Sequence, residues 1–351
     1  MKAAVYHGRE DVRIEDVPEP EVEPGHVKIS VPHNGICGTD LHEFFWGPVF
    51  IPTPEAPHPL TGAHLPVVIG HEFGGTVVEV GEGVDDLAVG DLVAVEPIEW
   101  CNECPQCLAG HYNLCPKIAF HGVHRHGGGL AEYTVIPRRM AHKAPDGVGP
   151  ELAALAEPMC VAFHGVVRAQ LEPGQTAVVH GAGPIGIGAY LGLRAEGIDD
   201  VIVVEPSPTR RAAVEKLGAP VVLDPGADDV AAAIMSHTRG KGADAQLDAA
   251  GVPASLNAAI ASTAAHGRVI TIAVFPEPVQ FNPNDILFRE VVMTSSMAYK
   301  DDYPRVLEHM ANGRYPMDGW VTHIAMDDLV NEGIMVLRDQ KAMKIMVDIG
   351  G

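Results

Sequence analysis

Four of the six cysteines are crowded together, with the spacing C-x2-C-x2-C-x7-C. The four are Cys101, Cys104, Cys107 and Cys115. In a long chain with no recognisable secretion signal, such crowding is typical of metal ligands rather than disulfides. The intervening glycine, asparagine and proline residues favour a loop that can wrap one tetrahedral zinc ion with four thiolates. Because four protein ligands leave no open position, this zinc would be structural; redox cysteines or chance spacing are the alternatives.

Three further residues could form a second, catalytic zinc site. Cys37 lies in the motif NGICGTDLH, His71 in GHE and Glu157 in the apolar run LAALAEPM. One thiolate, one imidazole and one carboxylate with an open fourth position are typical of a catalytic zinc. A buried Glu157 would need a partner, because an unpaired buried charge is costly. Taken singly, His71 could instead be an ordinary turn histidine, and Glu157 could lie on the surface of a helix.

A glycine-rich turn between a predicted strand and a predicted helix is typical of a dinucleotide-binding site. The strand TAVVH at 176–180 is followed by GAGPIG at 181–186 and then by an apolar stretch. Glycines at these positions allow a tight turn and let backbone N–H groups approach a pyrophosphate at the helix N-terminus. The candidate cofactor-binding residues of this motif are Gly181, Gly183, Pro184, Ile185 and Gly186.

Glu205 favours NAD over NADP as the dinucleotide. It ends a second predicted strand at 201–204, at about the 20-residue distance from the glycine motif that this fold uses for its acidic residue. Its carboxylate would accept hydrogen bonds from the ribose hydroxyls and repel a 2′-phosphate. Arg210 and Arg211 weaken this preference, because either could pair with the diphosphate, with the adenine face or with Glu205 itself.

The surrounding sequence predicts two kinds of architecture. From about residue 170 to 290, short apolar strands alternate with helical patterns, which predicts a doubly wound parallel sheet. The first 150 residues are rich in proline and glycine with short Val/Ile runs, which predicts a β-rich region with long loops.

The charge and the apolar pattern exclude several classes of protein. The 351 residues include 24 Lys and Arg against 46 Asp and Glu, a formal net charge of −22. This charge would repel nucleic acid and anionic membrane surfaces, so neither is an expected partner. The chain has no uninterrupted apolar run of ~18 residues and no secretory pattern at its start, so we expect a cytoplasmic protein. The acidity fits either ordinary solubility or a salt-rich cytoplasm.

Together these motifs resemble the zinc-dependent medium-chain dehydrogenases over the whole chain. The resemblance is carried by CGTDLH at 37–42, GHE at 70–72, the four-cysteine lobe, EP at 157–158 and GAGPIG at 181–186. Within this family the chain is most similar to the (R,R)-2,3-butanediol dehydrogenases. That narrower similarity rests on HPLTG at 58–62, ahead of GHEF, and on VEPI at 95–98.

The resemblance implies an α/β protein with two domains. Residues 1–160 and 292–351 would form a GroES-like, β-rich catalytic domain, with the structural zinc lobe at about 96–120. Residues 161–291 would form a doubly wound Rossmann domain that binds NAD. Members of the family form homodimers or homotetramers, and we expect the same here.

The resemblance also implies a reaction and its residues. The catalytic zinc would be held by Cys37, His71 and Glu157, with Glu72 as a partner of the ligands or an alternate ligand. A hydride would pass between a secondary alcohol or vicinal diol, of the 2,3-butanediol/acetoin type, and NAD. Thr39, the nicotinamide ribose and His42 would relay the proton.

Two alternatives remain open from the sequence. The substrate could be a polyol of the sorbitol type or L-threonine. The chain could also be a non-catalytic NAD-binding zinc protein, which would have no need of the relay residues.

Overall fold

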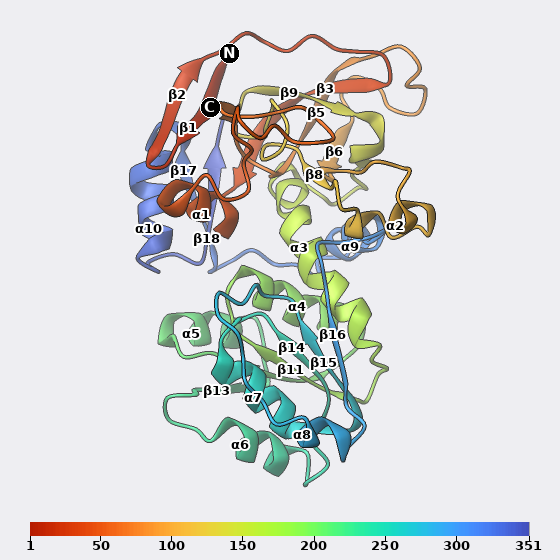
Figure 1. Ribbon diagram of the computed structural model, residues 1–351, viewed down its shortest axis with the longest axis vertical. Coiled ribbons are helices and arrows are strands. Elements are labelled where there is room, and N and C mark those ends of the chain that lie inside the picture. Colours follow the sequence, from red (N-terminus) through yellow and green to blue (C-terminus); the bar gives the residue numbers. More distant parts are fainter. Residues whose placement is uncertain (351) are drawn as a thin grey trace. The chain divides into compact units, whose positions relative to one another are not determined.

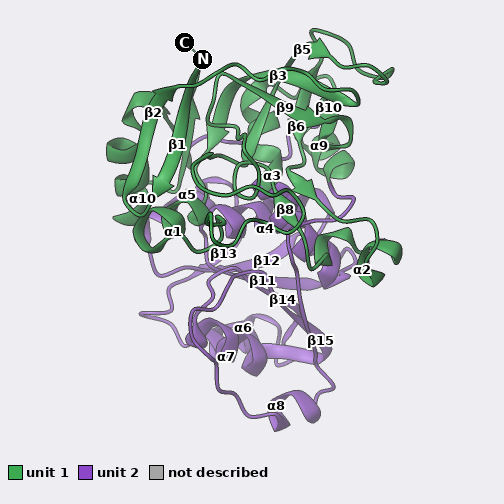
Figure 2. Ribbon diagram, turned by 45° about the horizontal axis from the view of Figure 1, so that its top comes forward, with its two compact units in different colours: residues 1–157, 303–311, 320–351 green, residues 158–302, 312–319 purple. Residues whose placement is uncertain are grey.

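The computed structural model describes residues 1–350, which form two compact units (Figure 2). Unit 1 contains residues 1–157, 303–311 and the chain from residue 320 onward, and unit 2 contains Pro158–Asp302 and Asn312–Gly319. The α/β fold class, a β-rich domain with a doubly wound one, is confirmed. Unit 2 extends beyond residue 291, where the sequence suggested its end, because the segment from 292 supplies its last strand.

Unit 1 is built on a large, mainly antiparallel sheet. The order of its strands is β10-β6-β5-β3-β18-β17, and β9 also pairs with β3. Their bounds are β3 His26–Gly35, β5 Glu72–Val80, β6 Leu92–Val95, β9 Tyr133–Pro137, β10 Ala141–Lys143, β17 Val321–Ala325 and β18 Lys344–Asp348. The C-terminal strand β18 lies beside β3, so the two ends of the chain share one sheet.

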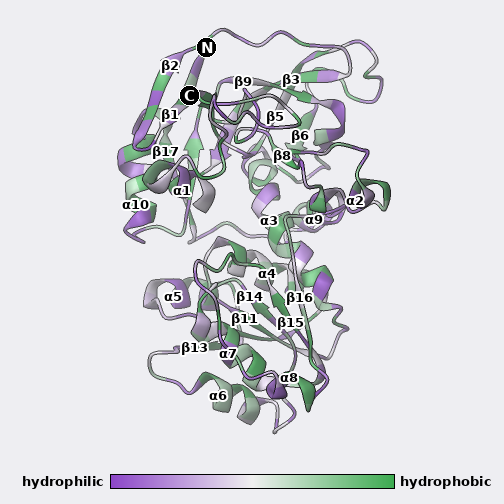
Figure 3. Cartoon of the chain, in the orientation of Figure 1, coloured by the Kyte–Doolittle hydropathy of each residue, from purple (hydrophilic) through white to green (hydrophobic). Residues whose placement is uncertain are grey.

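Smaller elements complete unit 1. Strands β1 (Lys2–Gly8), β2 (Asp11–Asp16) and β4 (Val67–Val68) form a second sheet, and β7 (Ile98–Glu99) pairs with β8 (Ala119–Phe120). The α-helices are α1 Gly38–Trp46, α2 Pro105–Leu108, α9 Tyr303–Ala311 and α10 Met335–Arg338. Short 3-10 helices lie at Tyr112–Leu114, Arg138–Met140 and Met326–Asp328, and a π-helix lies at Leu329–Ile334. Polar and apolar residues alternate along β2, as expected for a strand with one solvated face (Figure 3).

Unit 2 is a six-stranded parallel sheet with the order β13-β12-β11-β14-β15-β16 (Figure 1). The strands are β11 Thr176–His180, β12 Asp200–Val204, β13 Val221–Leu223, β14 Ala243–Asp248, β15 Thr263–Thr271 and β16 Val292–Ser295. The helices are α4 Pro184–Ala195, α5 Pro208–Lys216, α6 Val230–His237, α7 Pro253–Ser262 and α8 Asn284–Leu287. Counted within the unit, the strand order is that of a dinucleotide-binding Rossmann sheet.

Helix α3 (Pro150–Ala169) begins in unit 1 and ends in unit 2. By length and composition alone its 20 residues could cross a bilayer, but 78% of its apolar window is buried inside the protein. It also carries Glu157 and Pro158. These features are those of a core helix.

A buried ion pair connects the C-terminal strand of unit 1 with β5. The Nζ atom of Lys344 contacts a carboxylate oxygen of Glu72 and donates a hydrogen bond to the carbonyl of Ile36 at 2.9 Å. Both charged side chains are 2% exposed. A Cβ at Gly35 would collide with Glu72 and with the end of the Lys344 side chain, so a glycine is needed beside the pair. The pair therefore fixes the end of β3, the start of β5 and β18 around one point.

Replacing Lys344 by methionine should lower the free energy of unfolding of the protein by about 3–5 kcal/mol, because the Glu72 carboxylate stays buried without its cation. Denaturant titration followed by tryptophan fluorescence measures this change. Lys2→Met is the matched control, since Lys2 forms an exposed pair with Asp327 at 3.7 Å and should cost less than about 1 kcal/mol. Equal effects of the two substitutions would contradict a central role for the buried pair.

Candidate active site

The end of β3 and the start of α1 position the first group of candidate residues. Cys37 is the residue that precedes the helix, and its backbone N–H donates to Asp40 Oδ2 at 2.8 Å. Its thiol donates to the Thr39 hydroxyl at 3.7 Å. His42 follows Thr39 by three residues and therefore shares its helix face. It is exposed, with its ring 5.5 Å from that of Trp46. These residues lead from the partly buried Cys37 to the exposed His42.

The start of β5 brings a second group to the same point. Ligand atoms of Cys37, His71 and Glu72 all lie within 4.8 Å of one another. His71 is 5% exposed and Glu72 is 2% exposed. Glu157, on α3, is also buried at 4% exposure, and its charge acts on the Cys37 thiol. Of the predicted residues, the structure thus brings Cys37 and His71 together with Glu72.

The charges of this cluster do not balance. Burial raises the pKa of the Cys37 thiol, and the carboxylates of Glu72 and Asp40, with a smaller effect from Glu157, raise it further. Burial also raises the pKa of Asp40. His71 Nδ1 is buried without a hydrogen-bond partner and lies 3.9 Å from Asp40 Oδ1. A thiolate can form here only beside a cation, and sulfur, nitrogen and oxygen donors together suit zinc.

Two residues of the cluster were missed by sequence reasoning. Asp40 stands three residues after Cys37, which is the spacing of a capping residue that reaches back to a helix N-terminus. This spacing could have predicted the contact between Asp40 and Cys37. No local pattern could have predicted the role of Lys344, because it is a single lysine far along the chain from Glu72.

The four crowded cysteines converge in the lobe that contains α2. The Sγ atoms of Cys104 and Cys107 are 3.4 Å apart, and those of Cys101 and Cys115 are 3.5 Å apart. Four thiolates around one zinc at ~2.3 Å would be about 3.8 Å apart. Several hydrogen bonds lower the pKa of Cys101 to about 6, and the bond from the backbone N–H of Glu103 has the largest effect. The sulfur atoms are therefore close to the separation that a tetrahedral zinc site requires.

The glycine motif of unit 2 forms the expected turn between β11 and α4. Gly181 has a φ of +93°, which favours glycine. A Cβ at Gly186 would collide with the Gly181 carbonyl oxygen, so the first turn of the helix also needs a glycine. Gly183 precedes α4, and Pro184 occupies its first position, where no N–H is needed. The helix N-terminus is thus open to an anionic group.

Glu205 is buried at 3% exposure and is already engaged by backbone groups. Its two carboxylate oxygens accept from the N–H of Ala182 at 2.7 Å and from that of Ser207 at 2.8 Å. A carboxylate has about four acceptor sites, so it can still accept from ligand hydroxyls. A Cβ atom added at Gly183 would lie 3.9 Å from Arg210 Nη1, so the guanidinium of Arg210 lies next to the glycine motif.

Arg211, by contrast, donates to the carbonyls of Glu205 and Pro206 and pairs with Asp224 at 2.9 Å. The guanidinium of Arg211 is therefore already engaged by groups of the protein itself. Arg210 is therefore the arginine of the two that lies over the glycine motif.

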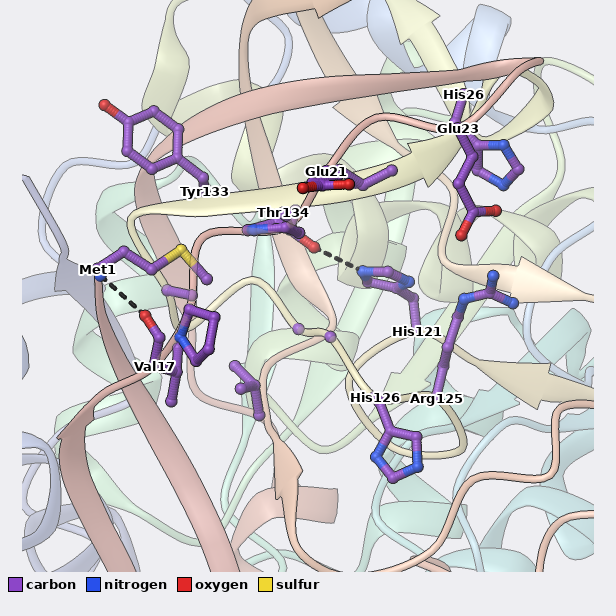
Figure 4. Close-up of a pocket in the computed structure, with 17 residues that line it drawn as sticks. Met1, Val17, Glu21, Glu23, His26, His121, Arg125, His126, Tyr133 and Thr134 are labelled. Atoms are coloured by element: carbon purple, nitrogen blue, oxygen red, sulfur yellow. Dashed lines mark hydrogen bonds between the residues drawn. The ribbon is translucent and has the colours of Figure 1, made fainter. Parts of the chain in front are cut away.

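A separate hollow of about 290 Å³ in unit 1 shares none of these residues (Figure 4). It is lined by groups of both charges, among them Glu21, Glu23 and Arg125. His121 lies in the wall of the hollow and is 1% exposed. Its Nε2 atom forms a hydrogen bond with Thr134 Oγ1 at 2.8 Å. Burial, above all, lowers the pKa of His121 to about 3, so this ring is neutral. The hollow has no part in the chemistry of the cluster around Cys37.

Models of two protein families match this chain. One, the alcohol dehydrogenase GroES-like domain, matches residues 23–146, and the other, the zinc-binding dehydrogenase domain, matches residues 184–312. Together they cover the greater part of both units.

Similar proteins include several dehydrogenases. (R,R)-butanediol dehydrogenase of Bacillus subtilis (strain 168) is 42% identical over 99% of both chains. Sorbitol dehydrogenase of the same organism and L-threonine 3-dehydrogenase of Pyrococcus furiosus are each 33% identical, over 89% and 99% of this chain and 86% and 97% of those proteins.

Solved structures agree with these matches. That of 2R,3R-butanediol dehydrogenase from Bacillus subtilis has a TM-score of 0.92 over 99% of both chains. A zinc-binding dehydrogenase from Sinorhizobium meliloti 1021, bound to NADP, is 32% identical over 99% of this chain and 98% of that one, with a TM-score of 0.90. These matches confirm the expected family. The chain belongs to the zinc-type alcohol dehydrogenases, and it is an alcohol or diol dehydrogenase that uses a nicotinamide cofactor.

Proposed function

We propose that this enzyme interconverts a vicinal diol of the 2,3-butanediol class and the corresponding hydroxyketone. The diol loses a hydride to NAD and a proton to solvent, and the products are the hydroxyketone and NADH. The convergence of Cys37, His71 and Glu72 at a buried point carries the proposal of zinc chemistry. The full-length similarity to a butanediol dehydrogenase carries the choice of substrate over a polyol or L-threonine.

Two zinc ions per chain are proposed, one in each set of donors. Cys101, Cys104, Cys107 and Cys115 would hold the structural ion. Cys37, His71 and Glu157 would hold the catalytic ion, while Lys344 keeps Glu72 engaged beside it as an alternate ligand. When bound, the catalytic zinc supplies Lewis-acid chemistry, which lowers the pKa of a substrate hydroxyl.

The chain's own residues would position the ligands and move the proton. Asp40 faces His71 Nδ1 and can hold that ring in one orientation. Thr39 stands beside the Cys37 sulfur, and His42 stands on the same helix face at the surface. This placement suits a relay in which Thr39 accepts the hydroxyl proton, the nicotinamide ribose passes it on, and His42 releases it to water.

NAD is the proposed cofactor because Glu205 presents a buried carboxylate beside the glycine motif. Gly181, Gly183, Pro184, Ile185 and Gly186 would bind the diphosphate, with Arg210 as a cationic neighbour. Relatives with NADP exist, so this preference depends on Glu205 rather than on the fold.

A homo-oligomer in the cytoplasm is also proposed. Strand β16 is the edge of the unit 2 sheet, and the nearby side chains of Leu287, Phe288 and Val292 are exposed. An apolar sheet edge of this kind suits pairing with a second copy of the chain. None of the six cysteines forms a disulfide bond, which fits a reducing compartment.

The direct test is NADH formation at 340 nm with NAD and separate alcohols. The panel contains (R,R)-, meso- and (S,S)-2,3-butanediol, sorbitol, L-threonine and 2-propanol. We expect the highest kcat/KM with the (R,R)- or meso-diol and loss of activity after treatment with a chelator. Activity confined to sorbitol or threonine would discard the diol assignment, and no activity with any alcohol would favour the non-catalytic alternative.

Cys104→Ser should reduce the zinc content from two ions to one per chain, because one thiolate of the tetrahedral set is lost. Elemental analysis of the dialysed protein measures this. Cys160→Ala is the matched control, since Cys160 lies outside both donor sets, and it should retain both ions. An unchanged zinc content in Cys104→Ser would contradict the structural site.

His42→Ala should lower kcat by about 100-fold, the lower end of the range for acid–base groups, with zinc content unchanged. Added imidazole should restore part of the rate, because His42 is exposed. His126→Ala, another exposed histidine, serves as the control. If kcat of His42→Ala equals that of the parent enzyme across pH 6–9, His42 is not in the relay.

Glu205→Gln should reduce the preference for NAD over NADP, measured as the ratio of the two kcat/KM values, by about tenfold or more. The substitution removes the charge that repels a 2′-phosphate, and tenfold corresponds to about 1.4 kcal/mol. Glu215→Gln, an exposed position on α5, is the control. A ratio that stays constant would assign the cofactor preference to other residues.

A further inference from the structure

Two histidines and an aspartate meet on three neighbouring strands of unit 1. Asp348 of β18 lies directly opposite His33 of β3. His323 of β17 lies opposite Met346, which shares a face of β18 with Asp348 because side chains alternate along a strand. All three side chains therefore project from one face of the sheet. Met346 is fully buried, whereas Asp348 is 43% exposed, so the group lies where this face reaches the solvent.

The three side chains are already aimed at one another. His33 Nδ1 lies 2.8 Å and His323 Nδ1 lies 2.9 Å from the same oxygen, Asp348 Oδ1. The ligand atoms all lie within 4.8 Å of one another. Nitrogen and oxygen ligands on one zinc ion at ~2.1 Å would be about 3.4 Å apart in a tetrahedron. Each histidine nitrogen would need to move only about half an ångström away from the aspartate oxygen to make room for an ion.

A fourth group is suited to orient one of the imidazoles. The other ring nitrogen of His323, Nε2, lies 3.8 Å from Glu151 Oε1 at the start of α3. Histidine ligands of metals usually direct their second ring nitrogen to a carboxylate or carbonyl, which fixes the tautomer and makes the ligand nitrogen more basic. His323 has this arrangement, with Nδ1 in the cluster and Nε2 toward a carboxylate.

We propose that His33, His323 and Asp348 form a third metal site, which binds a divalent transition-metal ion of the zinc type. Two imidazoles and one carboxylate favour zinc, cobalt or nickel over magnesium or calcium, which prefer oxygen ligands alone. The partial exposure of the ligands leaves room for water to complete the coordination. The site lies on residues that the proposed catalysis does not use.

The bound ion would link the two ends of the chain. His33 belongs to the N-terminal part of the sheet, and His323 and Asp348 belong to its last two strands. An ion that binds only the folded arrangement stabilises it by mass action, so stability should rise with the concentration of free metal. The ion would thus stabilise unit 1 at the junction of β3, β18 and β17.

The experiment measures zinc binding to the dialysed holoenzyme, which retains its resident metal. Equilibrium dialysis against excess free Zn²⁺, followed by elemental analysis, should show one additional zinc per chain, and Tm should rise with it. The double substitution His33→Gln and His323→Gln should abolish both the additional zinc and the rise in Tm. It should leave kcat with the best alcohol of the panel unchanged.

The matched control is His237→Gln. His237 pairs with Asp200 at 2.7 Å, and its exposure, 33% with 41% for Asp200, is close to that of His323 and Asp348. This pair has only one histidine, so its loss should not change the additional zinc. Asp348→Asn keeps both imidazoles and should weaken binding without removing a hydrogen-bonding side chain. Binding that is absent in the parent enzyme, or equal in the double variant, would overturn the proposal.

Discussion

The structure of unit 1 depends on the balance of charge at a point where several acidic groups are buried. Asp40, Glu72 and Glu157 are all less than a tenth exposed, and the Cys37 thiol lies among them. Burial of so much potential negative charge is unfavourable unless cations compensate it. Lys344 supplies one, and the ligand atoms of Cys37, His71 and Glu72 lie close enough together to hold a metal ion as a second. The glycine at position 35, the turn before α1 and the position of β18 all serve this arrangement.

Unit 2 stabilises a buried carboxylate by different means. Its one buried acid at the glycine motif, Glu205, is held by backbone N–H groups rather than by a lysine. The motif itself carries no side-chain charge, so an anionic ligand would meet the N-terminal dipole of α4 and the guanidinium of Arg210. The two units therefore differ in the groups they offer to a ligand: side-chain charge suited to a cation in unit 1, and backbone dipoles suited to an anion in unit 2.

The features that sequence could predict are those encoded within short segments. The four cysteines and the glycine motif each span few residues, so spacing alone predicts a chemistry for them, and the strand–helix alternation predicted the fold class correctly. Lys344 and Asp348 find their partners only when the last strand pairs with β3, and no local pattern records that pairing. The strand β16 is likewise short and partly exposed, so its sequence alone does not assign it to the sheet of unit 2.

The pairing of β18 with β3 has a consequence for the order in which the protein is made. Residues of β3 and β5 leave the ribosome long before residue 344, and the strands of unit 2 are synthesised in between. Until Lys344 arrives, Glu72 has no cationic partner and the large sheet lacks its C-terminal strands. The cluster around Cys37 can therefore reach its final form only after nearly the whole chain has been translated, and a metal ion that requires this arrangement would bind late in biosynthesis.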